Sequence, residues 1–395
     1  MDNFSNFRVT MREKFDGIKA VFIRFRGLTT IGFGNIISAG ISAIFWFSLA
    51  SLLGAENYGH VSYFIAIASI SSTISFLGAG NTIIVYTAKG EKLQSPIFFI
   101  SIIASAITLI AVFIIFSQIG ISLYILGYVI FSLATSEILG KKMYGIYAKY
   151  LITQKILMTG FAISFYYFLG VEGVILGIAL SFFPYSIRIY KSFKESKMDL
   201  KLIKPRFGFM MNTYALDLSR TLSGSTDKLL ILPMFGFAIL GNYQLGIQFL
   251  AVLNIIPSIV YQFILPEDSS GNSNNKLKKY TIVFSIILAF LGVTLSPFVL
   301  PTLFPKFADA VEVVQIISLS IIPSTINLIY ISKFLGKGLS KIILIGSGVF
   351  LLIQTSSIFV LGQIYGVNGI AIALLIATSV EAIFLIITNR IFYRI

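Results

Sequence analysis

Long apolar runs recur along the whole sequence. Twelve segments of about 20 mostly apolar residues follow one another, separated by short polar stretches. A run of this length crosses a bilayer as a helix, because only helices or closed barrels satisfy their backbone hydrogen bonds within lipid. The sequence therefore predicts an all-α polytopic membrane protein with about 12 transmembrane helices. The predicted spans are 29–53, 61–87, 96–116, 119–139, 150–169, 171–190, 209–235, 242–265, 280–300, 311–331, 342–361 and 367–387.

Basic residues are distributed unevenly over the loops. Only 12% of the residues are charged, about half the share in an average soluble domain, and the net charge is +14. Nearly all of the 30 Lys and Arg residues fall in the termini and in every second loop. The exceptions are Lys306 in an opposite loop, and Arg220 and Lys228 within the span at 209–235. By the positive-inside rule, this pattern predicts cytoplasmic N- and C-termini in a multi-pass protein of the cytoplasmic (inner) membrane.

The composition argues against several classes of function. The chain has no Cys and a single His, His60, so neither a metal nor a cofactor is expected. Because the basic charge follows the loops, nucleic acid is not an expected partner. The predicted outer loops are only a few residues long, whereas a membrane polymerase or glycosyltransferase needs a sizeable catalytic loop. We therefore do not expect an enzyme.

Two matches within the sequence indicate an internal repeat. GAENYGHVSYFIAIAS (54–69) aligns with GFAILGNYQLGIQFLA (236–251), and GVEGVILGIAL (170–180) aligns with GVNGIAIALLI (366–376). The matches lie at equivalent places in two six-span halves of the same orientation, and parallel repeats of this kind hold a transport site between the halves. The expected organisation is a cytoplasmic amphipathic lead-in, a six-helix bundle, a cytoplasmic linker and a second six-helix bundle, with a central cavity between the bundles. These parts correspond to residues 1–28, 29–190, 191–208 and 209–395.

The same segments resemble the polysaccharide-export flippases of the multidrug/oligosaccharidyl-lipid/polysaccharide (MOP) exporter superfamily. The resemblance rests on LLGAENYGHVSYFIAIASISSTISFLGAGN (52–81), a Gly-x4-Gly turn followed by an apolar span with Leu-Gly near its end. It rests also on DKLLILPMFGFAILGNY (227–243) and on the GVEG and GVNG turns. It covers nearly the whole chain.

This resemblance implies a flippase that works by alternating access. The implied cargo is a lipid-linked oligosaccharide on a polyprenyl phosphate or pyrophosphate carrier, such as an O-antigen unit for lipopolysaccharide or polysaccharide biosynthesis. The implied partners are membrane lipids, a driving Na+ or H+ gradient or the membrane potential, and polysaccharide assembly enzymes. A multidrug or peptidoglycan-precursor exporter of the same fold is an alternative, and a membrane polymerase or glycosyltransferase is a less favoured one.

The segment MNTYALDLSRTLSGSTDKLLI (211–231) places four charges inside a predicted span. Several of its residues recur at intervals of three or four, so they share one face of a helix. A charge at the bilayer centre costs about 2.5–3.5 kcal/mol on insertion scales, so this face is expected to line a water-filled cavity. The residues of the face are Thr213, Asp217, Arg220, Gly224 and Asp227.

Basic residues are the candidates for binding a head-group phosphate. Arg220 is the first candidate, because a guanidinium contacts phosphate in a bidentate manner, and Lys228 is the second. Arg24 and Arg26 precede the first span, where they are candidates for collecting the head group. For these two residues, a role in setting the membrane topology is the favoured alternative.

The acidic residues within the spans have competing interpretations. Asp217 and Asp227 are candidates for binding a coupling ion or for tuning Arg220, but a neutral Asp217–Arg220 pair would only hold the helix in its bundle. Glu381 either faces the cavity or bonds to a neighbouring helix. Asn35 aligns with Asp217 in the repeat, which makes it the polar cavity-lining counterpart in the first half.

Overall fold

The computed structural model describes residues 2–269, 274–307 and 309–392, with side chains for 30–265, 267–269, 274–307 and 309–391. The described residues form helices and no strand, which confirms the all-α class. The helices are α1 (Asp2–Phe76), α2 (Ala79–Ala88), α3 (Gln94–Phe116), α4 (Ile119–Gly140), α5 (Tyr144–Leu180), α6 (Ser186–Glu195), α7 (Phe207–Leu253), α8 (Ile255–Ser269), α9 (Asn275–Leu303), α10 (Ala310–Leu319), α11 (Ile321–Gly336) and α12 (Ser340–Phe392). Two 3-10 turns, η1 (Phe183–Tyr185) and η2 (Leu200–Arg206), complete the elements.

Eight stretches of the described helices are long and apolar enough to cross a membrane. Four of them have 22 to 29 residues, which suits one crossing each, and four have 47 to 54 residues. Since a crossing needs about 20 residues, each of the longer four holds two crossings. The described chain thus has about twelve crossings, as the sequence predicts, and the protein is a multi-pass membrane protein.

A single glycine divides each of the four longest helices. Gly54 and Gly236 have φ of 76° and 82° with ψ of 175° in both. Gly170 and Gly366 have φ of 63° and 59° with ψ of −142° and −136°. Positive φ is tolerated by glycine because it lacks a Cβ. Each pair stands at matching positions of the two sequence repeats, so the repeat is confirmed as a structural one.

The turn between the first two crossings is tighter than the sequence suggests. The predicted spans leave a loop at 54–60, but the helix resumes directly after Gly54. One residue with positive φ is enough to redirect the chain, so the residues after it are free to form the first turn of the second crossing. The same applies after Gly236.

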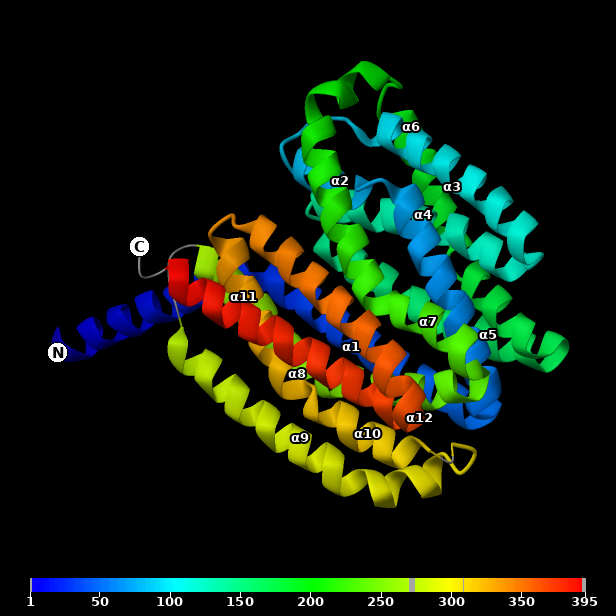
Figure 1. Cartoon of the computed structure of the whole chain (residues 1–395). Coiled ribbons are helices and arrows are strands. Elements are labelled where there is room, and N and C mark those ends of the chain that lie inside the picture. Colours follow the sequence, from blue (N-terminus) through cyan, green and yellow to red (C-terminus); the bar gives the residue numbers. More distant parts are fainter. Residues whose placement is uncertain (1, 270–273, 308, 393–395) are drawn as a thin grey trace.

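The helices form two groups that meet along α1 and α7. Helices α2 to α6 lie in one group and α8 to α12 in the other, with α1 and α7 between them (Figure 1). The contact of α1 with α7 is the most extensive between any two elements. Because α1 begins the first repeat and α7 begins the second, equivalent elements form the interface between the halves.

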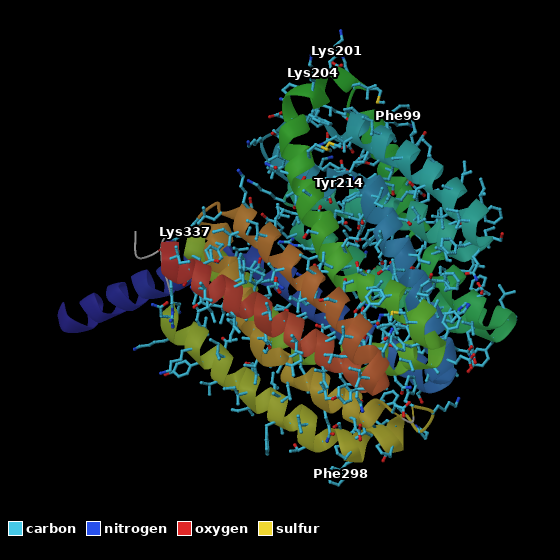
Figure 2. The ribbon with its side chains drawn as sticks, in the orientation of Figure 1. Phe99, Lys201, Lys204, Tyr214, Phe298 and Lys337 are labelled. Atoms are coloured by element: carbon cyan, nitrogen blue, oxygen red, sulfur yellow. The ribbon has the colours of Figure 1, made fainter. Side chains whose placement is uncertain are left out.

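The surface of the bundles is apolar, as lipid requires. Phe99 on α3 and Phe298 on α9 are 42% and 75% exposed, and both project from the outside of their groups (Figure 2). Basic residues gather elsewhere: Lys201 and Lys204 project from η2, and Lys337 lies at the end of α11 (Figure 2). We call the end of the bundles that carries the four glycine turns the outer end and the opposite end the inner end, after the predicted orientation.

Two glycines bring the halves into contact near the outer end. A Cβ added to Gly59 would lie 2.0 Å from the carbonyl oxygen of Phe237, and one added to Gly241 would lie 1.8 Å from that of Ala55. Gly59 and Gly241 are equivalent in the repeat, as are Ala55 and Phe237. The two contacts are therefore related by the pseudo-twofold axis of the molecule, and each requires a glycine.

Aromatic rings extend this contact at the outer end. Phe304, at the end of α9, packs against Phe47 of α1 and Phe249 of α7, with ring centroids 5.7 and 6.1 Å apart. Phe307 packs edge-on against Tyr58 at 5.9 Å. Phe304, Phe307 and Tyr58 are buried, so these rings pack between the halves on the outer side.

Candidate functional site

The charged segment of α7 is a regular helix. From Phe207 to the turn at Gly236 its backbone is helical throughout, so the segment is confirmed as a helical span in spite of its four charges. Arg220 stands 13 residues into this helix, or roughly 20 Å along its axis. Lys228 stands eight residues further, about 12 Å closer to the outer end.

A cavity of about 180 Å³ lies between α1 and α7. Because these helices belong to different halves, the cavity is central in the molecule. Both helices contribute polar residues to its walls, and Lys228 is the charged residue among those that line it. The lining residues are Trp46, Ser62, Ile65, Ala66 and Ser69 from α1, and Gly224, Ser225, Lys228 and Gln244 from α7.

Lys228 is held by one carbonyl and one carboxylate. Its Nζ donates to the carbonyl oxygen of Gly224 at 2.7 Å and lies 3.3 Å from Asp227 Oδ1. Asp227 also accepts the backbone N–H of Lys228 at 2.8 Å and the hydroxyl of Tyr243 at 2.8 Å. Both charged residues are buried, with 3% of Asp227 and 8% of Lys228 exposed. A buried pair of this kind keeps a charge in an apolar protein because each partner compensates the other.

Asp217 and Arg220 remain more accessible. Arg220 is exposed and Asp217 is half-buried, and they form no ion pair within 4 Å among the described side chains, although they interact electrostatically. The hydroxyl of Thr221, the residue after Arg220, shares a hydrogen bond with that of Thr73 of α1 at 3.0 Å. Helix α1 begins the first half, so this part of α7 faces the other half.

The residues at the two ends of the predicted face, Thr213 and Asp227, are buried by other parts of the protein. Thr213 is buried, and its Oγ1 donates to the carbonyl oxygen of Gly78 at 3.1 Å, so it joins α7 to the first half instead of lining a cavity. Asp227 is turned toward Tyr243, and Lys228 takes the position in the cavity. Gly224 does line the cavity. The predicted residues share one face of α7 by helical spacing, but their exposure differs along it: Thr213 and Asp227 are buried, whereas Arg220 is exposed.

The remaining predicted residues are dispersed. Glu381 accepts a hydrogen bond from Asn327 of α11 at 2.8 Å. Of the two interpretations of Glu381, this contact agrees with a bond to a neighbouring helix. Asn35 is half-buried in α1. Arg24 and Arg26 belong to α1, but their side chains lie outside the described residues.

Lys155 is a basic residue that the loop count missed. It lies 11 residues into α5, or about 16 Å from its start, and the count had grouped it with the preceding loop. Ala148, two turns earlier on the same face, packs against Gly34 of α1, so Lys155 is on the side of α5 that faces α1. A strict reading of the predicted span at 150–169 would have found it. Nothing in the sequence indicated that three other residues belong to the site, because such residues are also common in packed helices. These residues are Trp46, Gln244 and Tyr243.

Comparison with known proteins identifies the fold. The structure is similar to the lipid II flippase MurJ in an inward closed conformation, with a TM-score of 0.74 and 15% identity over 91% of this chain and 87% of that chain. It is also similar to a mutant of the Vibrio cholerae MATE transporter VcmN, with a TM-score of 0.64 and 12% identity over 93% and 97%. An inward-facing multidrug resistance MATE family transporter of the MOP superfamily gives a TM-score of 0.62 and 16% identity over 90% and 93%. No family model and no curated protein sequence matches the chain. The chain therefore shares the fold of these solved transporter structures, which is the fold that the resemblance implies.

Proposed function

We propose that this protein is a flippase that moves a lipid-linked oligosaccharide from the cytoplasmic to the outer leaflet by alternating access. The observation that carries the proposal is the position of Lys228, which lines the cavity between the halves. Arg220, exposed on the same helix and about 12 Å nearer the inner end, provides a second cationic group. An anionic head group entering from the inner side meets Arg220 first and Lys228 next.

The phosphate of the lipid carrier explains the need for these cations. A phosphate or pyrophosphate in the apolar midplane has a high desolvation cost, and a paired cation offsets much of it. Arg220 has a guanidinium with no ion-pair partner among the described side chains, so its donors are available for bidentate contact. Lys228 can exchange the carbonyl of Gly224 for a phosphate oxygen while Asp227 stays bonded to Tyr243.

Acidic residues beside the cations provide a means of coupling. Asp227 accepts bonds from both Lys228 and Tyr243, and a phosphate that draws Lys228 away leaves its carboxylate short of one partner. A proton or Na+ is then the natural replacement. Asp217 also lies in the field of a basic residue, Arg220, although the two form no ion pair within 4 Å among the described side chains. We therefore assign ion coupling to these two carboxylates and a structural role to Glu381, which bonds to Asn327.

An exporter of peptidoglycan precursor is the second candidate, because the TM-score to MurJ, 0.74, exceeds the 0.64 to the VcmN transporter. Both candidate cargoes carry a phosphate-linked sugar on a lipid, so the basic cavity suits either. A cationic drug fits less well, because it would be repelled by Arg220 and Lys228 and would find Asp227 already paired.

Reconstituted vesicles test the proposal. Arg220→Ala and Lys228→Gln should each lower the flipping rate of a polyprenyl-diphosphate oligosaccharide at least about tenfold, since a hydrogen bond to a charged group contributes about 1.5–3 kcal/mol. Lys149→Gln, at an exposed lysine outside the cavity, is the matched control and should flip at the normal rate. Normal flipping by both Arg220→Ala and Lys228→Gln would overturn the phosphate role. Faster flipping of a peptidoglycan precursor than of other glycans would favour the second candidate.

A further inference from the structure

A second cavity lies at the inner end of the first half. It has a volume of about 190 Å³ and is formed by α4, the beginning of α5 and α6. Two basic residues, Arg188 and Lys191, line it together with Tyr150 and several aliphatic residues, among them Ile146 and Ile187. The volume is roughly that of six water molecules in the liquid, which is enough for a phosphodiester group but too small for a whole lipid.

The cavity carries excess positive charge. Arg188 donates to the buried carboxylate of Glu137 through Nε and Nη2, at 2.9 and 2.8 Å. Lys141 pairs with Glu137 at 2.7 Å and with Glu195 at 2.5 Å. The two carboxylates are thus balanced by Arg188 and Lys141, while Lys191 takes part in no ion pair within the described part of the chain. The network also fixes the guanidinium of Arg188 at the cavity wall.

The rim of the cavity is apolar and open to lipid. Ile187 is 64% exposed and Ile146 is 39% exposed, and in a multi-pass membrane protein such side chains contact acyl chains. Tyr190, on the turn after Ile187, is 62% exposed, and a tyrosine at the end of a span is typical of the membrane–water interface. The cavity therefore stands at the depth of the head groups, with hydrocarbon contact directly beside it.

We propose that this cavity binds the head group of an anionic phospholipid of the cytoplasmic leaflet. Basic pockets between helices on the cytoplasmic side select anionic head groups by charge. Lys191 and the free end of the Arg188 guanidinium contact the phosphate, the Tyr150 hydroxyl is a further donor, and an acyl chain follows Ile146 and Ile187. The site is separate from the cavity between α1 and α7, so it concerns an ordinary membrane lipid and not the transported one.

Native mass spectrometry and thermal unfolding of the full chain in detergent micelles test this site. Phosphatidylglycerol and phosphatidylcholine are titrated against the wild type, Lys191→Gln and Lys194→Gln. Lys194 is the matched control because it lies on the same helix, with its ammonium 4.5 Å from the ring of Tyr190 and outside the cavity. Lys191→Gln should weaken phosphatidylglycerol binding about fivefold, because a basic residue near an anionic surface contributes about 1 kcal/mol. Lys194→Gln should weaken it less than about twofold.

Two further arms separate a lipid from a small anion. Ile187→Ser should weaken phosphatidylglycerol binding while leaving the charge of the cavity unchanged, and glycerol 3-phosphate alone should give no thermal stabilisation. Equal affinity of the wild type and Lys191→Gln for phosphatidylglycerol would overturn the proposal. So would equal binding of phosphatidylcholine, or full stabilisation by glycerol 3-phosphate without an acyl chain.

Discussion

A methyl group at Gly59 or Gly241 should prevent the two halves from closing at the outer end. The added Cβ would lie 2.0 Å from the carbonyl oxygen of Phe237 in the first case and 1.8 Å from that of Ala55 in the second. Carbon and carbonyl oxygen atoms in close helix contacts are normally about 3.3–3.6 Å apart. Helices α1 and α7 would therefore have to separate by more than 1 Å, roughly the difference between those distances. Both obstacles are backbone atoms, so no side-chain rotation can relieve them.

The size of the effect follows from the cost of overpacking. Inserting a group into a well-packed contact costs about 1–3 kcal/mol, which corresponds to a shift of about 5- to 150-fold in a two-state equilibrium. Gly59→Ala and Gly241→Ala should each lower the ratio of outer-closed to outer-open molecules by this factor. Because the two sites are equivalent in the repeat, the double variant should be shifted further than either single one.

Spin labels can measure this shift, since the chain has no native Cys. Ser117, between α3 and α4, and Thr302, near the end of α9, are exposed on opposite halves at the outer end. Labels at Ser117→Cys and Thr302→Cys should show a longer distance population in the Gly59→Ala variant than in the parent. Gly160→Ala is the control, because nothing lies within 4 Å of its added Cβ. An unchanged distance distribution in Gly59→Ala would refute the view that the halves close on this glycine.

Three other predictions concern the buried charges and the open part of α7. Asp227→Asn should destabilise the protein by about 3–5 kcal/mol, because it leaves the ammonium of Lys228 buried without a counter-charge. An unchanged unfolding midpoint in detergent would contradict the view that Asp227 compensates the buried charge of Lys228. Arg220→Cys should react with a water-soluble thiol reagent and Thr213→Cys should not, since the first position is exposed and the second is buried. Reaction of Thr213→Cys but not of Arg220→Cys would show that α7 is rotated. Glu137→Gln should lower the unfolding midpoint clearly, because it removes the carboxylate that holds α4 to α6. A midpoint equal to that of the parent would argue against the ion pairs of Glu137 with Lys141 and Arg188.

The sequence was sufficient for the crossings and for the repeat. Apolar runs and basic loops depend on local composition, so they can be read without knowing which helices touch. The two Gly-x4-Gly turns were also visible in the sequence, but the role of the second glycine was not. Gly54 is needed for its own positive φ, whereas Gly59 is needed because the backbone of Phe237, far away in the sequence, approaches it.

The candidate site was predictable only up to the face of one helix. Spacing along α7 places Asp227 on the same face as Arg220, but Asp227 accepts a hydrogen bond from Tyr243 and Lys228 lines the cavity. Tyr243 follows the turn at Gly236, so this contact depends on how the chain folds back after the turn. Lys155 was missed for a simpler reason: the boundary between a loop and a span is uncertain by several residues, and a lysine near it is readily counted with the loop.

The most direct test of the proposed function is flipping by the purified protein in vesicles that contain a fluorescent polyprenyl-diphosphate oligosaccharide. Accessibility of the glycan to an added lectin or glycosidase reports its movement between leaflets. Vesicles with the wild-type protein should expose the glycan faster than protein-free vesicles, and Arg220→Ala should remove most of this difference. Equal rates in wild-type and protein-free vesicles, under both an applied ion gradient and an applied membrane potential, would contradict the central claim.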